Sequence, residues 1–534
     1  MPVTASNKKK GKVMSLLTPQ RPALRVADLL QTVHRIFCIC CALIFSWLFL
    51  GVLFENKIYS FNTLAVIFSI LCWLVATVYL YRALNRHEAL LIRWEKHIIA
   101  VIMVVVFTVQ LNLGYWLAVE TSWDTEAVYR GAVNLSLHGN LGNYREYFHI
   151  FPHNLGATAL LGWLFSAGAA VGVEDLYWIG TVYNVISLTL GVWLVYGIAR
   201  ELKDVKHGLL ALWFVVTCLP LQFYTPVFYT DTLSLPFVAG VYYFYLRLLK
   251  QDVFHKRLLL GLLVGALCAL GALMKFSAAI VAIAILADLV LRQQLWRQRY
   301  SVVAALVIFF ILLKSFTSYR DNHLLDERYS DLKRVPHAHW VMMGLKGNGS
   351  YNSEDYTFTY RFRTYEQRQN ANLVQIRQRI ADYGFWGYLE FLNRKQQLNF
   401  GSGIYGVPEM IDDNPLRPNA LHQFVLDGGR YFDYFKIVAQ GHHVLLFLLI
   451  IWGMWYDAVT RNRQAVTIFA ARTAVLGIYL FLLLWEANSR YVFNFIPLFV
   501  ICAAYSFPYA YRTLAALRQA FLEVLRPIDE QEAA

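Results

Sequence analysis

Long apolar runs separated by short polar connections make up most of this chain. A membrane-spanning helix needs about 20 mostly apolar residues, and twelve runs approach or reach that length. They cover residues 36–54, 61–81, 97–119, 177–199, 208–224, 232–249, 258–273, 277–291, 301–316, 442–456, 473–485 and 491–511. The pattern predicts an all-α polytopic membrane protein with about 12 transmembrane helices.

One further apolar stretch, residues 154–172, is rich in Gly and Ala and follows Pro152. Basic clusters decide its placement, because Lys and Arg collect on the cytoplasmic side of membrane proteins. If the stretch crossed the membrane, every later cluster would face outward. If it is re-entrant or juxtamembrane, the later clusters at residues 200–206, 250–257, 292–299, 461–472 and 512–518 face the cytoplasm, as the earlier cluster at 82–96 does. We therefore predict that it does not cross and that both termini are cytoplasmic.

This topology divides the chain into five parts. The segment 317–440 is too long for a simple connection, so we expect a small extracytoplasmic domain with turns at 347–349 and 427–429. The parts are a basic cytoplasmic tail (1–35), an N-terminal transmembrane module (36–316) with a first outer loop (120–176), the extracytoplasmic domain (317–440), the C-terminal transmembrane helices (441–511) and a second cytoplasmic tail (512–534).

Composition agrees with a membrane protein. Of the 534 residues 58% are hydrophobic and 16% aromatic, and the mean hydropathy is +0.43. The net charge of +13 comes from Lys and Arg in the connections, where they orient spans, so no nucleic-acid partner is predicted. All seven cysteines lie in apolar segments, which argues against a disulfide framework or a thiolate metal site.

Charged residues collect at the predicted outer boundary of the membrane. Asp124 and Glu126 follow the third run, and Asp231 opens the run at 232–249. A lone charge at such a place is usually an interfacial anchor. A carboxylate there, however, escapes a burial cost of roughly 3 kcal/mol at mid-membrane and can stay ionised as a general base. Asp124, Glu126 and Asp231 are therefore the candidate catalytic residues.

Cations lie at the same predicted boundary. Lys275 stands in a very short junction between two runs, and Arg490 with Tyr491 opens the last run. Lys and Arg at headgroup depth bind phosphate, and Arg does so with two parallel hydrogen bonds. Lys275, Arg490 and Tyr491 are the candidate phosphate-binding residues.

Carboxylates opposite cations suit transfer of a sugar from a polyprenyl phosphate. The phosphate is a good leaving group that needs charge stabilisation, and the acceptor hydroxyl needs a base. Acceptor or sugar contacts are predicted at His149, His153, His339 and Trp340. For each of them a surface or packing role is the alternative.

Several short motifs resemble those of the GT-C glycosyltransferases, the superfamily of protein O-mannosyltransferases and aminoarabinose transferases. They are 123–129 (WDTEAVY), 151–153 (FPH), 229–231 (YTD), Lys275 in its junction, and Arg490-Tyr491 followed by Pro497. The segment 339–345 (HWVMMGL) with Tyr351-Asn352 also resembles GT-C-like membrane proteins of Gram-positive bacteria.

The resemblance implies a GT-C fold, Asp124 as the base, a polyprenyl-phosphate sugar donor and inversion at the anomeric carbon. Many relatives have adjacent acids where Thr125 here separates Asp124 from Glu126, so the role of Glu126 stays open. The resemblance also leaves the use of a divalent metal open, because the superfamily contains metal-using and metal-free members. The acceptor expected is a cell-surface glycan, lipid or protein outside the cell membrane.

Two other classes fit a protein with many spans. A lipid-linked glycan flippase or transporter needs polar residues near the midplane and often has paired halves, whereas here the ionisable residues collect at one face. A polysaccharide polymerase or ligase holds a lipid-linked polymer, and product length would distinguish it from a single-sugar transferase.

Overall fold

The computed structural model describes residues 21–55, 60–411 and 414–524. Within these ranges the chain is helical, and its only β-type pairing is an isolated bridge between Val119 and Pro415. Most of the predicted basic N-terminal tail lies outside the described residues. The all-α prediction is confirmed.

Ten helices in the described ranges are long and apolar enough to cross a membrane, counting the short turns that continue some of them. Two apolar helices are shorter, α8 (Val205–Val216) and α13 (Ile280–Leu291), the second preceded by the 3₁₀ turn η4 (Phe276–Ala279). Each of the twelve predicted spans overlaps one of these helices. The ten are α1 (Arg21–Leu50), α2 (Thr63–Arg86), α3 (Glu88–Trp116), α7 (Leu176–Leu202), α11 (Leu235–Lys250), α12 (Phe254–Met274), α14 (Arg299–Tyr319), α21 (Phe432–Thr460), α22 (Phe469–Leu484) and α23 (Ile496–Val524).

The predicted span 208–224 is broken in the structure. Helix α8 ends at Val216, and a short helix, α9 (Leu219–Phe223), begins with Pro220 in its first turn. Proline has no N–H and its ring clashes with the preceding turn, which favours a break or a kink in a helix at that position. Asn184 of α7 donates hydrogen bonds to the carbonyls of Tyr224, Thr225 and Val227 at 3.0, 2.9 and 3.1 Å. These bonds satisfy irregular backbone that leads directly to Asp231.

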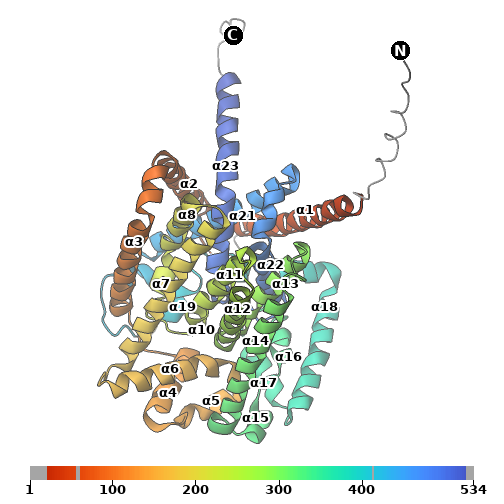
Figure 1. Ribbon diagram of the computed structural model, residues 1–534. Coiled ribbons are helices and arrows are strands. Elements are labelled where there is room, and N and C mark those ends of the chain that lie inside the picture. Colours follow the sequence, from red (N-terminus) through yellow and green to blue (C-terminus); the bar gives the residue numbers. More distant parts are fainter. Residues whose placement is uncertain (1–20, 56–59, 412–413, 525–534) are drawn as a thin grey trace, which may run out of the picture.

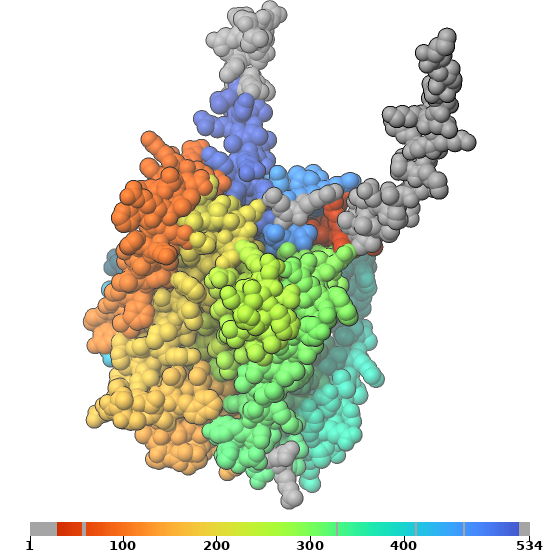
Figure 2. All heavy atoms as spheres, viewed as in Figure 1, coloured from red at the N-terminus to blue at the C-terminus, as the bar shows by residue number. Residues whose placement is uncertain are grey.

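The spans run between two ends of the molecule. Helices α7, α11, α21 and α23 are largely buried, whereas α2, α3 and α14 expose apolar side chains. Helix α23 extends beyond the bundle at one end of the molecule in Figure 1. We call the opposite end, which α4–α6 and α15 occupy, the loop end (Figures 1 and 2).

Three helices from the predicted first outer loop lie across the loop end. They are α4 (Trp123–His138), α5 (Arg145–Ile150) and α6 (Leu155–Ala170), and α4 and α6 run across the bundle rather than along it (Figure 1). They pack closely because Gly131 lies against Phe148 and Thr158. Helix α6, which covers most of the ambiguous stretch 154–172, has 16 residues and is not among the helices that are both long and apolar enough to cross.

Residues 317–440 form short helices that pack onto the spans. Their polar first part holds α15 (Glu327–Lys333), α16 (His337–Met343) and α17 (Ser353–Tyr360), and the predicted turns contain Gly347, Gly349 and Gly428 at positive φ. Helix α18 (Tyr365–Phe400) is interrupted at Gly384, where φ is 58°. Its second half reaches the spans: Asn399 donates to the Leu482 carbonyl of α22 and accepts from the Asn488 N–H.

Candidate active site

Asp124 lies in the first turn of α4, which begins abruptly. Ser122 and Thr125 form a capping box, with the Ser122 N–H donating to Thr125 Oγ1 at 3.2 Å. Between them Trp123 takes a φ of 45° and is 90% exposed, an unusual conformation for a bulky residue. The preceding strand-like segment is fixed by the Glu120 N–H, which donates to the Asn414 carbonyl at 3.0 Å. Asp124 thereby turns toward the bundle while Trp123 points to the surface.

Tyrosines hold the Asp124 carboxylate. Tyr147 of α5 donates to Oδ1 at 2.7 Å, and Tyr229 approaches Oδ2 at 3.4 Å. Asn154 donates to the Tyr147 hydroxyl at 2.6 Å, which fixes that side chain in turn. Burial, followed by the Asp124 carboxylate, raises the pKa of Tyr147 well above its ordinary value, so this phenol remains a donor. The Asp124 side chain is still 42% exposed and is open to a substrate.

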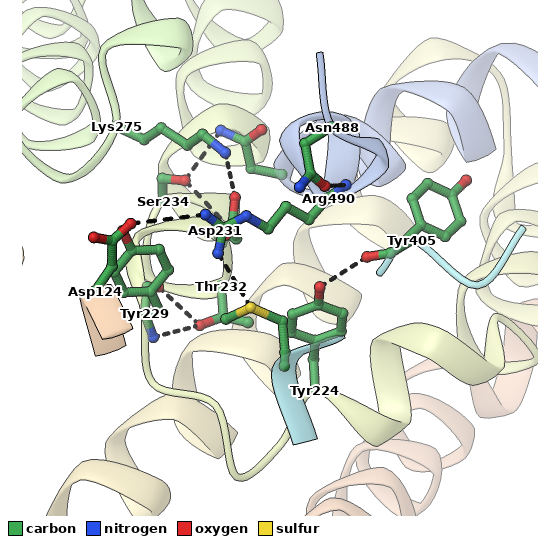
Figure 3. Close-up of polar contacts among 12 residues, drawn as sticks. Asp124, Tyr224, Tyr229, Asp231, Thr232, Ser234, Lys275, Tyr405, Asn488 and Arg490 are labelled. Atoms are coloured by element: carbon green, nitrogen blue, oxygen red, sulfur yellow. Dashed lines mark hydrogen bonds and ion pairs between the residues drawn. The ribbon is translucent and has the colours of Figure 1, made fainter. Parts of the chain in front are cut away.

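Asp231 and Lys275 form an ion pair beside this carboxylate (Figure 3). Asp231 belongs to the short helix α10 (Thr230–Leu233), and Lys275 stands in extended backbone between α12 and η4. The Asp231 side chain is almost fully buried, and its Oδ2 has no partner among the described residues. Burial lowers the pKa of Lys275, and the attraction of Asp231 opposes that change.

Arg490 completes the cluster. It opens the 3₁₀ segment η7 (Ser489–Phe495), and its N–H donates to the Asn488 side chain at 3.0 Å. Its guanidinium lies 3.9 Å from Asp124 Oδ2 and over the rings of Tyr229 and Tyr491. Lys275 Nζ lies 4.9 Å from the centre of the same Tyr491 ring. The structure therefore brings Asp124, Asp231, Lys275, Arg490 and Tyr491 together from four separate segments. Figure 3 shows the first four of these residues.

The remaining predicted residues make contacts outside this cluster. Glu126 accepts from Tyr144 at 2.9 Å. His149 is buried, with Nδ1 2.7 Å from Ser330 Oγ of α15. His339 is also buried, against Thr359, and burial lowers its pKa to about 4. His153 is exposed and its ring lies 6.1 Å from that of Trp340.

Sequence reasoning missed the residues that position Asp124. Tyr147 and Asn154 carry no motif that marks them, and Tyr229 has only its place beside Asp231 as a signal. Among the described residues, no three His, Cys, Asp or Glu side chains lie close enough together to share a metal ion.

The chain matches one family model over residues 25–511, described as a conserved hypothetical integral membrane protein. It belongs to this family. No curated protein matches it.

The chain is also similar to solved structures. One is the oligosaccharyltransferase AglB from Archaeoglobus fulgidus in complex with an inhibitory peptide and a dolichol-phosphate (12% identity, TM-score 0.42), with 81% of this chain and 53% of that one covered. The apo form of the Archaeoglobus fulgidus oligosaccharyltransferase gives 13% identity and a TM-score of 0.43, covering 81% and 52%.

A third similar structure is ArnT from Cupriavidus metallidurans bound to undecaprenyl phosphate. It has 13% identity and a TM-score of 0.33, covering 78% of this chain and 79% of that one. AglB and ArnT are GT-C membrane glycosyltransferases, the superfamily that the sequence motifs resemble. The chain spans about half the length of the archaeal enzyme.

Proposed function

We propose that this protein is an inverting glycosyltransferase that moves a sugar from a polyprenyl-phosphate donor to an acceptor hydroxyl at the outer face of the cell membrane. The observation that carries the proposal is the open Asp124 carboxylate, 3.9 Å from the Arg490 guanidinium, with Lys275 in the same cluster. A base and two cations meet there where spans end. A lipid-linked donor reaches such a place with its phosphate at headgroup depth and its chain in the bilayer.

Each group has one part in a single displacement. The acceptor oxygen attacks the anomeric carbon while its proton passes to an Asp124 carboxylate oxygen. The bond from the anomeric carbon to the phosphate oxygen breaks, and the electron pair leaves with the polyprenyl phosphate. Attack opposite the leaving group inverts the anomeric centre.

Lys275 and Arg490 stabilise the phosphate charge as it develops. Asp231 holds Lys275 in place and balances its charge before the donor arrives, since its own side chain is too buried to take a proton from the acceptor. No step of this reaction needs a metal ion, and assays with and without EDTA test whether one contributes.

Substitution of the proposed base tests the reaction. Asp124→Asn keeps the size of the side chain and one oxygen that can accept from Tyr147, but it removes the basicity, so transfer by purified protein should fall at least about 100-fold. The assay supplies a panel of undecaprenyl-phosphate hexoses and follows donor consumption. Glu174→Gln removes an exposed carboxylate from the same loop and should leave transfer unchanged. An Asp124→Asn protein with full activity would show that the base is elsewhere.

A further inference from the structure

Aromatic side chains from three distant segments meet beside the cluster described above. Trp340 of α16 stacks on Trp485 at 6.2 Å between ring centres, with 24° between the planes. His153 meets the Trp340 ring edge-on at 6.1 Å, and Phe151 lies 6.1 Å from Trp340 and 6.5 Å from Tyr356. These five residues are called the aromatic wall, and Tyr351, in the loop just before the helix α17 that carries Tyr356, is counted with it.

The wall is not a closed core. Tyr351 is 58% exposed and His153 is exposed, while Trp340 and Trp485 are only partly covered. His339, the neighbour of Trp340 in sequence, is by contrast fully buried. Large aromatic faces that stay open to solvent next to a reactive cluster are typical of ligand sites.

A buried carboxyl group adjoins the wall. Glu486 follows Trp485 in the loop between α22 and η7, and it is only 5% exposed. Its carboxyl hydrogen-bonds Tyr491 and lies near Arg490, while burial raises its pKa to about 7. Burial first, then Tyr356, and then Glu486 and Asp124 raise the pKa of Tyr351. The Phe151 ring lies 5.1 Å from the ring of Tyr147, which donates to Asp124. The wall is thus linked to the proposed base through Tyr147 and to Glu486 through Trp485.

We propose that the aromatic wall and Glu486 form the acceptor subsite and that the acceptor is a saccharide. This inference rests on the proposed function. Flat aromatic faces stack on the C–H faces of a pyranose ring, and a carboxyl beside them exchanges hydrogen bonds with its hydroxyls. Trp340 and Tyr351 hold the acceptor ring. Glu486 hydrogen-bonds one hydroxyl of that ring, so that the adjacent hydroxyl of the same sugar meets Asp124.

Acceptor choice gives the first test. Purified protein with a saturating undecaprenyl-phosphate hexose is offered octyl glycosides of glucose, galactose and N-acetylglucosamine, Ser/Thr-containing decapeptides, and dioleoylglycerol. At least one glycoside should be the preferred acceptor. A preference for the peptides or for dioleoylglycerol overturns the inference while leaving the proposed transferase intact. If no donor in the panel is consumed with any acceptor, it is the proposed function that fails.

Trp340→Ala gives the second test. It should raise KM for the preferred glycoside about tenfold, with KM for the donor unchanged. Trp340→Phe retains an aromatic face and should fall between the wild type and the alanine variant. Trp386→Ala is the matched control, since Trp386 is 78% exposed on α18 and is no part of the wall. Equal acceptor KM values for Trp340→Ala and Trp386→Ala, or a rise in donor KM alone, contradict the acceptor subsite.

Discussion

At the scale of single residues, uncharged side chains orient the candidate base Asp124 through hydrogen bonds. Tyr147 donates to Asp124, and Asn154 donates to Tyr147. Hydrogen bonds of this kind keep a carboxylate oriented without replacing the water that a half-exposed side chain retains. The nearest cation, Arg490, stays 3.9 Å away, so Asp124 is not locked into a close ion pair.

Two buried ionisable groups near the site have opposite effects on stability. Burial raises the pKa of Glu486 from 4.5 to about 7 and lowers that of Lys395, in α18, from 10.5 to about 7. Lys395 Nζ donates to the Gly344 carbonyl at 2.5 Å and is fully buried. From pH 4.5 to 7 folded Glu486 keeps a proton that the unfolded chain releases, so this residue makes stability fall as pH rises. From pH 7 to 10.5 folded Lys395 has lost a proton that the unfolded chain keeps, so stability rises again.

We therefore expect each substitution to flatten one limb of the pH profile. The stability of Glu486→Gln relative to wild type should rise as pH rises from 5 to 7. The stability of Lys395→Met relative to wild type should fall as pH rises from 7 to 9. Shifts of about 2 °C in Tm are expected. Thermal unfolding in detergent at several pH values measures both. Parallel profiles for variants and wild type would show that these groups titrate normally.

At the scale of secondary-structure elements, close helix contacts set the position of the cluster. Gly156 of α6 lies directly against the Leu273 carbonyl of α12, two residues before Lys275, and a Cβ there would collide with that backbone. Helix α6 follows Asn154, and α12 ends next to Lys275. This contact therefore joins the residues that orient Asp124 to the proposed phosphate site.

Gly156→Ala should separate α6 from α12. Overpacking of this kind costs about 1–3 kcal/mol, so Tm and transfer rate should both fall. In Gly387→Ala the nearest atoms to the new Cβ are those of Tyr383 at 3.8 Å or more, and neither quantity should fall. Unchanged activity in Gly156→Ala would mean that the cluster does not depend on this contact.

At the scale of the whole molecule, the two ends differ in chemistry. Helix α23 extends from one end, and α4–α6 with α15 lie at the other (Figure 1). The basic clusters that predict a cytoplasmic face precede or follow the spans at the end from which α23 extends. The reaction proposed here needs the loop end to face outward.

Labelling of single cysteines tests this orientation. In a background without the seven native cysteines, Trp123→Cys should react with a membrane-impermeant maleimide in intact cells, because position 123 is 90% exposed at the loop end. Leu517→Cys, in the exposed last turns of α23, should react only after permeabilisation. The reverse pattern would place Asp124 on the cytoplasmic side and remove the proposed outer-face reaction.

The sequence by itself determined where the apolar helices lie and which residues gather at their ends. Apolar length and charge placement are properties of consecutive residues, because a bilayer acts on each helix separately. It also pointed to Asp124, Asp231, Lys275 and Arg490, since ionised groups are tolerated at such ends. It did not reveal that Pro220 breaks a predicted span.

Only the tertiary structure decided which of these groups meet. The Asp231–Lys275 pair joins residues 44 apart, and Asp124 meets Arg490 across most of the chain. Tyr147, Asn154 and Trp485 gained their places through packing between α5, η3 (Pro152–Asn154) and the loop after α22, and no local pattern encodes such contacts. A single sequence carries no record of which distant side chains its folded form brings together.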